Sequence, residues 1–257
     1  MKRKMIIAGN WKMNNKIDDA LNLVRPLMSH PIDFENVEVV VAPSFTAIKS
    51  VSDLLSNSKI SIAGQNLHDQ ANGPFTGEVA ADMLADAGAT WVIVGHSERR
   101  SYFNETDDLI NKKLKAAIDF GSLRPILCVG ETLEERESNQ ANQVITNQLM
   151  SQIENLTIDQ FRKVTIAYEP VWAIGTGKTA TAEIAESIHK LIRNIIKENV
   201  GDSLADSIAI LYGGSLKPST AKELFSMDNI DGGLIGGAAL NFDDFSKIID
   251  EALLACK

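Results

Sequence analysis

Eight short, mostly apolar runs alternate with longer amphipathic stretches along the chain, and this alternation constrains the fold most. The runs cover residues 5–8, 37–42, 60–63, 91–94, 126–129, 164–168, 208–212 and 233–235. Runs that are apolar throughout, rather than at every second position, are typical of strands buried on both faces of a parallel sheet. Between them, apolar side chains recur at helical spacing, as in residues 17–28, 107–120, 182–199 and 242–255.

Eight strand-helix units in 257 residues favour a closed α/β fold, a (β/α)8 barrel that takes up residues 1–257 as a single domain. A doubly wound open sheet is the alternative. No linker, low-complexity tract or shift in composition indicates a second domain. Both architectures bind ligands beyond the carboxyl ends of their strands, so we look for chemistry directly after each run.

Composition excludes several classes of function. No apolar run approaches the ~20 residues of a membrane span, and the apolar stretch after the basic first residues is too short for a signal peptide, so we expect a cytoplasmic protein. Cys128, Cys256 and the four histidines show no metal-ligand spacing, which predicts no metal. A net charge of −9 disfavours nucleic acid as a partner, and an anionic substrate would then need local positive groups.

Glu169 follows the sixth run and directly precedes a glycine-bearing loop. Pro170 and Trp172 stiffen the start of this loop, whereas Gly175 and Gly177 leave its tip free to move as a lid. A lid that expels water would make the carboxylate a stronger base, suited to removing a proton from carbon. A surface loop behind a capped strand is the simpler interpretation of Glu-Pro alone.

Charged and titratable side chains also follow the first and fourth runs. Lys12, close to Asn10, could neutralise an anionic substrate at the mouth of an acidic protein. His96 precedes an expected helix N-terminus, which disfavours the imidazolium and would leave a neutral ring to polarise a carbonyl. We assign Glu98 to orienting Lys12 or its neighbours rather than to proton transfer, and we interpret Arg99 and Arg100 as structural ion-pair partners. The other histidines, His30, His68 and His189, we interpret as structural or surface residues.

Glycine pairs follow the last two runs and predict an anion site. Gly213-Gly214-Ser215 and Gly236-Gly237 would let backbone N–H groups approach a phosphate closely, with Gly175 as a further donor. Residues 175–179 also suggest a P-loop, but that motif needs its first glycine where this chain has Trp172. We therefore reject a nucleotide triphosphatase.

Several runs in a fixed order show that the chain closely resembles the triosephosphate isomerase family over nearly its whole length. They are AGNWKMN (8–14), QN (65–66), GPFTGEV (73–79), VGHSERR (94–100), ILCVGE (126–131), YEPVWAIGTGKTA (168–180), YGGSLKP (212–218) and DGGLIGGAAL (231–240). Such a set is far more specific than any one of its members.

The resemblance implies a TIM-barrel isomerase that interconverts dihydroxyacetone phosphate and D-glyceraldehyde 3-phosphate without a cofactor, in glycolysis and gluconeogenesis. It implies Glu169 as base, His96 as electrophile, and Asn10 and Lys12 as substrate contacts. The phosphate would lie at Gly175, Ser215, Gly236 and Gly237.

The resemblance also implies a homodimer. In the family, the segment that matches Gly73 to Val79 reaches into the partner subunit, where the residue matching Thr76 supports the partner's active site. The chain departs from the family pattern at Ala182, where proline is frequent, at Ala239, where serine is frequent, and at an apparent extra residue near Gly121. None of these positions is a proposed catalytic side chain.

Two rival functions remain open at this stage. Another phosphate-binding barrel enzyme, such as a sugar-phosphate epimerase, would share the late glycine pairs but would not require Lys12, His96 and Glu169 together. A binding or scaffold protein on the same fold would have no reason to retain these side chains.

Overall fold

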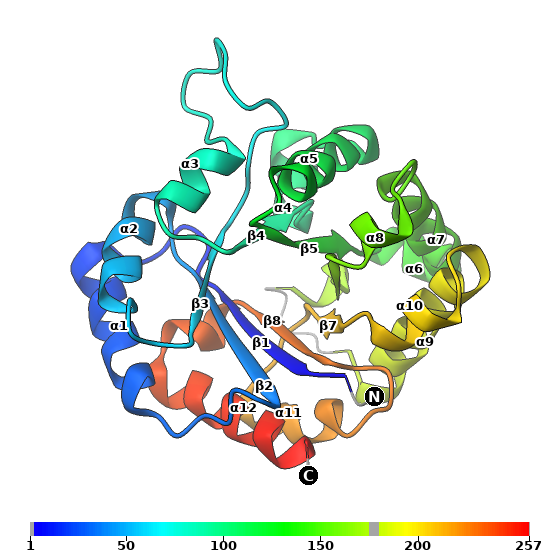
Figure 1. Ribbon diagram of the computed structural model, residues 1–257. Helices are drawn as coiled ribbons and strands as arrows, with labels where there is room; N and C mark the ends of the chain where they lie inside the picture. Colours follow the sequence, from blue (N-terminus) through cyan, green and yellow to red (C-terminus); the bar gives the residue numbers. More distant parts are fainter. Residues whose placement is uncertain (1–2, 175–179, 257) are drawn as a thin grey trace.

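The computed structural model of this chain describes residues 3–174 and 180–256, and within them eight parallel strands close into a barrel in the order β1 to β8. Helices form a ring around the strands (Figure 1). The strands are Met5–Asn10 (β1), Val37–Ala42 (β2), Ser61–Gly64 (β3), Trp91–Val94 (β4), Arg124–Val129 (β5), Thr165–Tyr168 (β6), Ile210–Tyr212 (β7) and Gly232–Ile235 (β8).

The helices lie between the strands along the chain. The α-helices of the described residues are Ile17–Ser29 (α1), Phe45–Leu54 (α2), Ala81–Asp86 (α3), Ser97–Phe103 (α4), Asp107–Phe120 (α5), Leu133–Glu137 (α6), Ala141–Gln152 (α7), Ile158–Phe161 (α8), Ala182–Asn199 (α9), Asp202–Ser207 (α10), Pro218–Phe225 (α11) and Phe242–Ala255 (α12). Two 3₁₀ turns, Val171–Ala173 (η1) and Gly237–Leu240 (η2), follow β6 and β8.

The apolar runs form strands because both of their faces are buried. Side chains such as Ile6, Val40 and Ile126 fill the barrel interior, while Ile7 and Val39 belong to the larger core between strands and helices. Burial removes each strand from water on both sides, which explains why the runs do not alternate with polar residues.

The longer helices bury an apolar face and begin at a polar N-cap residue, as α9 illustrates. In α9, Ala185, Ile188, Ile192 and Ile196 are buried at helical spacing, and the Thr181 hydroxyl caps the helix by accepting from the N–H of Ile184.

The expected barrel is confirmed, and the open sheet is excluded because β1 pairs with β8. The expected bounds are matched to the residue for β2, β4, α5, α9 and α12. The other six strands differ from expectation by one or two residues at an end. Among them, β1 continues to Asn10, which pairs with Ala42, and β7 begins at Ile210.

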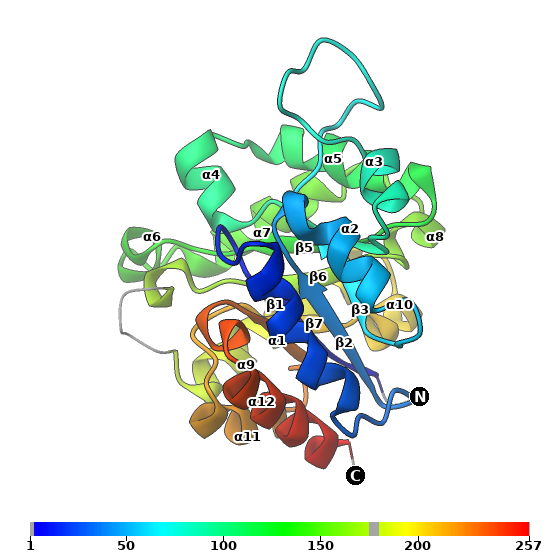
Figure 2. The same ribbon diagram turned by 90° about the vertical axis from the view of Figure 1, so that its left-hand side faces the viewer.

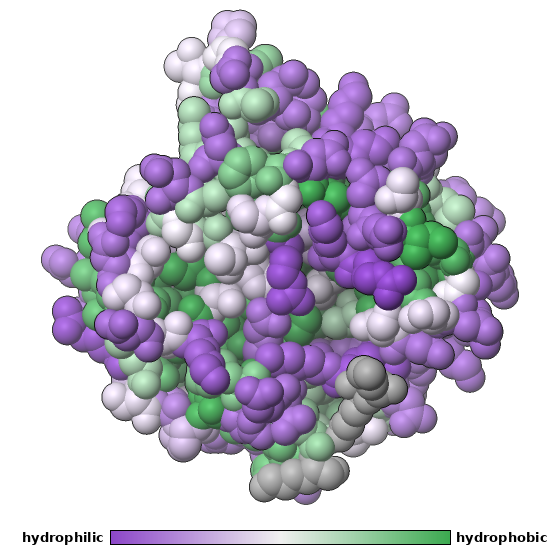
Figure 3. All heavy atoms as spheres, in the orientation of Figure 1, coloured by the Kyte–Doolittle hydropathy of each residue, from purple (hydrophilic) through white to green (hydrophobic). Residues whose placement is uncertain are grey.

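Different elements lie at the two ends of the barrel. The side view places α4 and α6 at one end and the start of β1 at the other (Figure 2). The segment between β3 and α3 projects far from the barrel in both views (Figures 1 and 2). The space-filling view shows a face dominated by hydrophilic residues, with this segment at its top (Figure 3).

Within the described ranges, no helix has the length and apolar character to cross a bilayer.

Candidate active site

Glu169 lies directly after β6 and is almost completely buried, with 1% of its surface exposed. Its carboxylate accepts hydrogen bonds from the backbone N–H of Ser97 (2.9 Å) and from the Ser97 hydroxyl (3.2 Å). Oε1, the carboxylate oxygen that accepts from the Ser97 hydroxyl, also lies 3.0 Å from His96 Nε2. The end of β6 and the start of α4 therefore bring together a buried carboxylate and an imidazole.

His96 is the N-cap of α4, as its position after β4 predicts. Its Nδ1 accepts a hydrogen bond from the backbone N–H of Glu98 (3.2 Å). A ring nitrogen that accepts from an amide carries no proton, so Nε2 holds the proton of the neutral ring and donates it towards Glu169.

The pKa values of this pair reflect their mutual contact. Burial lowers the pKa of His96, but the facing Glu169 carboxylate outweighs burial and leaves the pKa raised. Burial raises the pKa of Glu169, yet His96 and both Ser97 donors outweigh it and leave the pKa lowered. Burial thus acts on Glu169 in the expected direction, but in this arrangement the three donors stabilise the carboxylate and outweigh it.

Lys12 and Asn10 extend the same site from the end of β1. Asn10 is buried, and its Oδ1 accepts from the backbone N–H of Lys12 (3.1 Å). The Lys12 ammonium contacts Glu98 Oε1 at 2.6 Å, which agrees with the orienting role that we assigned to Glu98. Glu98 Oε2 lies 3.6 Å from His96 Nδ1, so this carboxylate is close to both Lys12 and His96 but bonds only to Lys12.

The glycines after β7 and β8 permit close approach around these side chains. A Cβ on Gly213 would lie 2.8 Å from Cγ of Glu169, so only glycine leaves room for the carboxylate. A Cβ on Gly236 would lie 3.6 Å from Cε of Lys12, which places the start of η2 beside the ammonium group. Ser215 lies in the loop after β7, and Gly237 begins η2. Gly175, the remaining predicted phosphate contact, and Gly177 lie outside the described residues.

Glu131 anchors the start of the connection that follows Glu169. It is fully buried, and its Oε1 accepts from the Tyr168 hydroxyl (3.0 Å) and the Trp172 indole N–H (2.8 Å). Arg136 contacts the same oxygen at 3.0 Å and balances the buried charge. The first part of the expected lid is therefore fixed to the end of β5.

The residues that we interpreted as structural have structural partners. Arg99 pairs with Glu105, and Arg100 pairs with Asp107. His30 contacts Asp250, and His68 packs against the ring of Phe75. His189 is fully buried beneath Tyr168.

Sequence reasoning missed the contribution of Ser97 to holding Glu169. The available signal was its place just after His96, because the first N–H groups of a helix have no partner within the helix and bind carboxylates readily.

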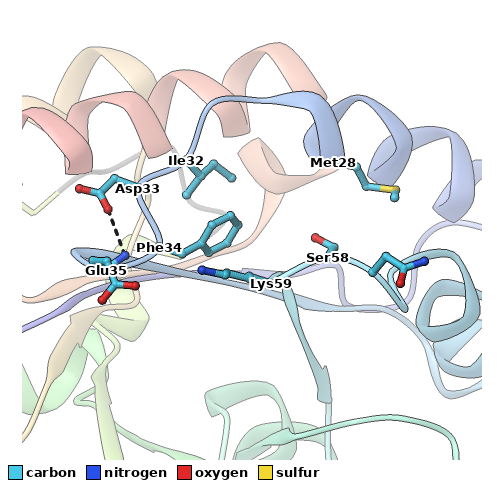
Figure 4. Close-up of a pocket in the computed structure, with 8 residues that line it drawn as sticks. Met28, Ile32, Asp33, Phe34, Glu35, Ser58 and Lys59 are labelled. Carbon is cyan, nitrogen blue, oxygen red and sulfur yellow. Dashed lines mark hydrogen bonds between the residues drawn. The ribbon is translucent and has the colours of Figure 1, made fainter.

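A separate hollow of about 450 Å³ lies at the other end of the barrel, between the α1–β2 and α2–β3 connections (Figure 4). Ile32, Phe34 and Met28 supply much of its apolar lining, and Lys59 reaches across it. None of the residues that we singled out from the sequence lines this hollow, so we assign no chemistry to it.

Comparisons with known proteins agree with one family. The family model described as "Triosephosphate isomerase" matches residues 5–252. Curated proteins of that name are similar over nearly their whole length. Those of Phocaeicola vulgatus and Clostridium botulinum are 49% identical over 249 residues and 50% identical over 248 residues, and each match covers 96% of this chain. The matches cover 98% and 99% of those two relatives.

Proposed function

Because the chain belongs to the triosephosphate isomerase family, we propose that it interconverts dihydroxyacetone phosphate and D-glyceraldehyde 3-phosphate at the ends of β1, β4 and β6. The two sugars are isomers that share one enediolate, so the reaction needs a base that moves a proton between adjacent carbons. It also needs an acid that serves both oxygens. No net oxidation occurs, so no redox cofactor is required.

In our proposal, Glu169 is the base and the His96 Nε2–H group is the acid. Both are held within a buried site, where a fixed donor near a developing oxyanion is effective. To reach a substrate carbon, the carboxylate must give up its bonds to Ser97 and His96. Its pKa then rises, because burial remains while the donors are lost, and His96 loses the negative charge that favours its imidazolium form.

We assign Lys12 and Asn10 to the substrate's oxygens and phosphate. Lys12 supplies positive charge in a protein whose net charge is −9. The backbone N–H groups of Gly236 and Gly237, with Ser215 and Gly175, would bind the phosphate and supply binding energy remote from the reacting carbons.

The observation that carries the proposal is the 3.0 Å contact between His96 Nε2 and a carboxylate oxygen of Glu169. We expect Glu169→Gln to lower kcat by about 10²–10⁴-fold while inhibitor binding is kept, because the amide preserves shape but cannot accept the proton. His96→Gln should lower kcat by a similar order. A coupled turnover assay checks both, and a Glu169→Gln enzyme with near-normal kcat would remove this residue from the role of base.

We also propose a homodimer that forms through the projecting segment between Gly73 and Val79, with Thr76 supporting the partner's site. Large apolar side chains are exposed on the elements that follow β1 to β4. They include Met13 (96% exposed), Tyr102 (77%), Phe103 (62%) and Met83 (52%). Where such side chains form one contiguous patch, they mark a protein interface.

We place the enzyme in the cytoplasm. The reaction belongs to central sugar metabolism, and the buried Cys128 is a free thiol, as is usual in reducing compartments.

A further inference from the structure

Lys12 has a backbone conformation that its residue type seldom adopts. Its φ of 54° lies in the left-handed region, where the Cβ atom of a residue other than glycine crowds the backbone. Such a conformation persists only where neighbouring groups hold it, and it is frequent at functional sites. The direction in which the Lys12 side chain leaves the barrel therefore depends on the groups that bind its peptide units.

Two side chains bind the backbone of Lys12. Asn10, which we have placed in the site, accepts from its N–H group (3.1 Å). Gln65 binds the other side: its Nε2 donates to the Lys12 carbonyl oxygen (2.8 Å) and to the Ala42 carbonyl oxygen (2.9 Å).

The position of Gln65 explains how one amide reaches both carbonyls. It directly follows β3, and Ala42 is the last residue of β2, which lies between β1 and β3. Ala42 also accepts from the N–H of Trp11, so the ends of three neighbouring strands meet at this amide. Each N–H of the amide donates to one of the two carbonyl oxygens. A side chain of the same size or polarity without two N–H donors could not make both bonds.

We propose that Gln65 is a positioning residue that holds Lys12 in its left-handed conformation and so keeps the ammonium group at the substrate's phosphate. This inference rests on the proposed role of Lys12 in binding. The expected consequence concerns affinity, because an ammonium that drifts from the site weakens binding of substrate and inhibitor, whereas Glu169 and His96 remain in place. The Michaelis constant should rise more than kcat falls.

The test uses two variants and a matched control. Gln65→Glu keeps the shape but presents oxygens to both carbonyls, and Gln65→Ala removes the amide. Asn111→Ala is the control, because Asn111 Nδ2 likewise donates to two carbonyls, those of Gln152 and Glu154, away from the site. We expect KM for the triose phosphate, and Kd for 2-phosphoglycolate measured by calorimetry, to rise about tenfold in both Gln65 variants, as two lost hydrogen bonds imply. Asn111→Ala should leave both constants within about twofold of wild type, a change below that of one typical hydrogen bond.

Three outcomes would overturn the inference. The first is an unchanged inhibitor Kd in Gln65→Glu. The second is a weakened affinity that recovers fully as protein concentration rises, which would assign Gln65 to subunit association. The third is loss of folded protein in both Gln65 variants while Asn111→Ala folds, which would assign Gln65 to stability.

Lys12→Met separates this inference from the proposed function. If inhibitor affinity is unchanged in Lys12→Met, the role of Lys12 itself fails. If Lys12→Met weakens binding and the Gln65 variants do not, only the positioning role fails.

Discussion

At the scale of single residues, His189 combines complete burial with a titratable ring. Its Nδ1 donates to the carbonyl oxygen of Asn229 (3.2 Å), and the ring meets Tyr168 edge-on. Burial lowers the pKa of His189 to about 3, far below the ordinary value of 6.5. The folded protein therefore excludes a proton that the unfolded chain binds in mild acid.

This exclusion predicts a loss of stability in acid. As pH falls from about 6.5 towards 3, the unfolded chain gains the proton first, so the free energy of unfolding decreases by up to about 1.4 kcal/mol per pH unit from this residue. Below about pH 3 both states bind the proton, and the contribution stays constant.

His189→Asn keeps a donor for Asn229 but cannot titrate. Although the smaller side chain lowers stability at pH 7, we expect a flatter dependence of unfolding free energy on pH between 6.5 and 4. Urea unfolding at several pH values measures both slopes, and the carboxylates common to the two proteins serve as internal control. Parallel curves for wild type and variant would show that His189 does not set the acid sensitivity.

Site residues could be predicted from the sequence where their position at the end of a strand is enough to place them in the site. Asn10 ends β1, while Lys12, His96 and Glu169 follow strands, and parallel strands of one barrel bring their carboxyl ends together. The two hydrogen bonds from Gln65 to the carbonyl oxygens of Lys12 and Ala42 were not predictable, because they depend on the spacing of three strands that are distant in sequence.

At the scale of elements, the predicted bounds are correct where polarity and hydrogen bonding change at the same residue, as in β2 and β4. They differ where the two changes separate. Residues 208–209 are apolar, but the N–H of Ile208 donates to Leu204 and closes α10, so β7 starts at Ile210. Asn10 is polar yet pairs with Ala42, so β1 runs two residues further than its apolar run, which ends at Ala8.

The ends of β6 and β7 approach so closely that Gly213 has no room for a methyl group. In Gly213→Ala the new Cβ would lie 2.8 Å from Cγ of Glu169 and 3.0 Å from the Tyr168 carbonyl oxygen. The carboxylate must move, and a displacement of about 1 Å from productive geometry can cost on the order of 10² in rate.

We therefore expect Gly213→Ala to lower kcat by about tenfold to a hundredfold with a smaller change in inhibitor affinity, since Lys12 and Gly236 are not displaced. Turnover assays and inhibitor calorimetry provide the two numbers, and circular dichroism shows whether the fold is retained. A folded Gly213→Ala enzyme with wild-type kcat would mean that Glu169 has more freedom than its contacts indicate.

At the scale of the whole molecule, the closed barrel gives every strand two neighbours. One sector, made of the elements that follow β1 to β4, still exposes large apolar side chains to solvent. The exposed apolar side chains Met13, Phe45, Met83 and Tyr102 follow β1, β2, β3 and β4 in turn. The segment that projects between β3 and α3 carries Phe75, which is 39% exposed (Figure 2). A second copy of the chain would bury this sector and receive the projecting segment in return, as a symmetric interface requires.

Removing residues 73–78 from the projecting segment should therefore yield a monomer. We expect little isomerase activity in it, because Thr76 would no longer support the partner's Lys12 and His96. Tyr102→Glu should weaken association without any deletion, since it places a charge within the proposed interface. Ile158→Glu is the matched control: Ile158 is an apolar residue of α8, 52% exposed, and α8 lies between β5 and β6, outside the elements that follow β1 to β4.

Sedimentation velocity over a range of concentrations gives the assembly state, and turnover measured in the same samples gives specific activity. The proposal requires that both fall together in the shortened chain and in Tyr102→Glu, that activity in Tyr102→Glu recovers as concentration drives association, and that Ile158→Glu behaves as wild type. An intact, active dimer without residues 73–78 would exclude this segment from the interface. A fully active monomer would show instead that each barrel positions Lys12, His96 and Glu169 by itself, so that association contributes stability alone.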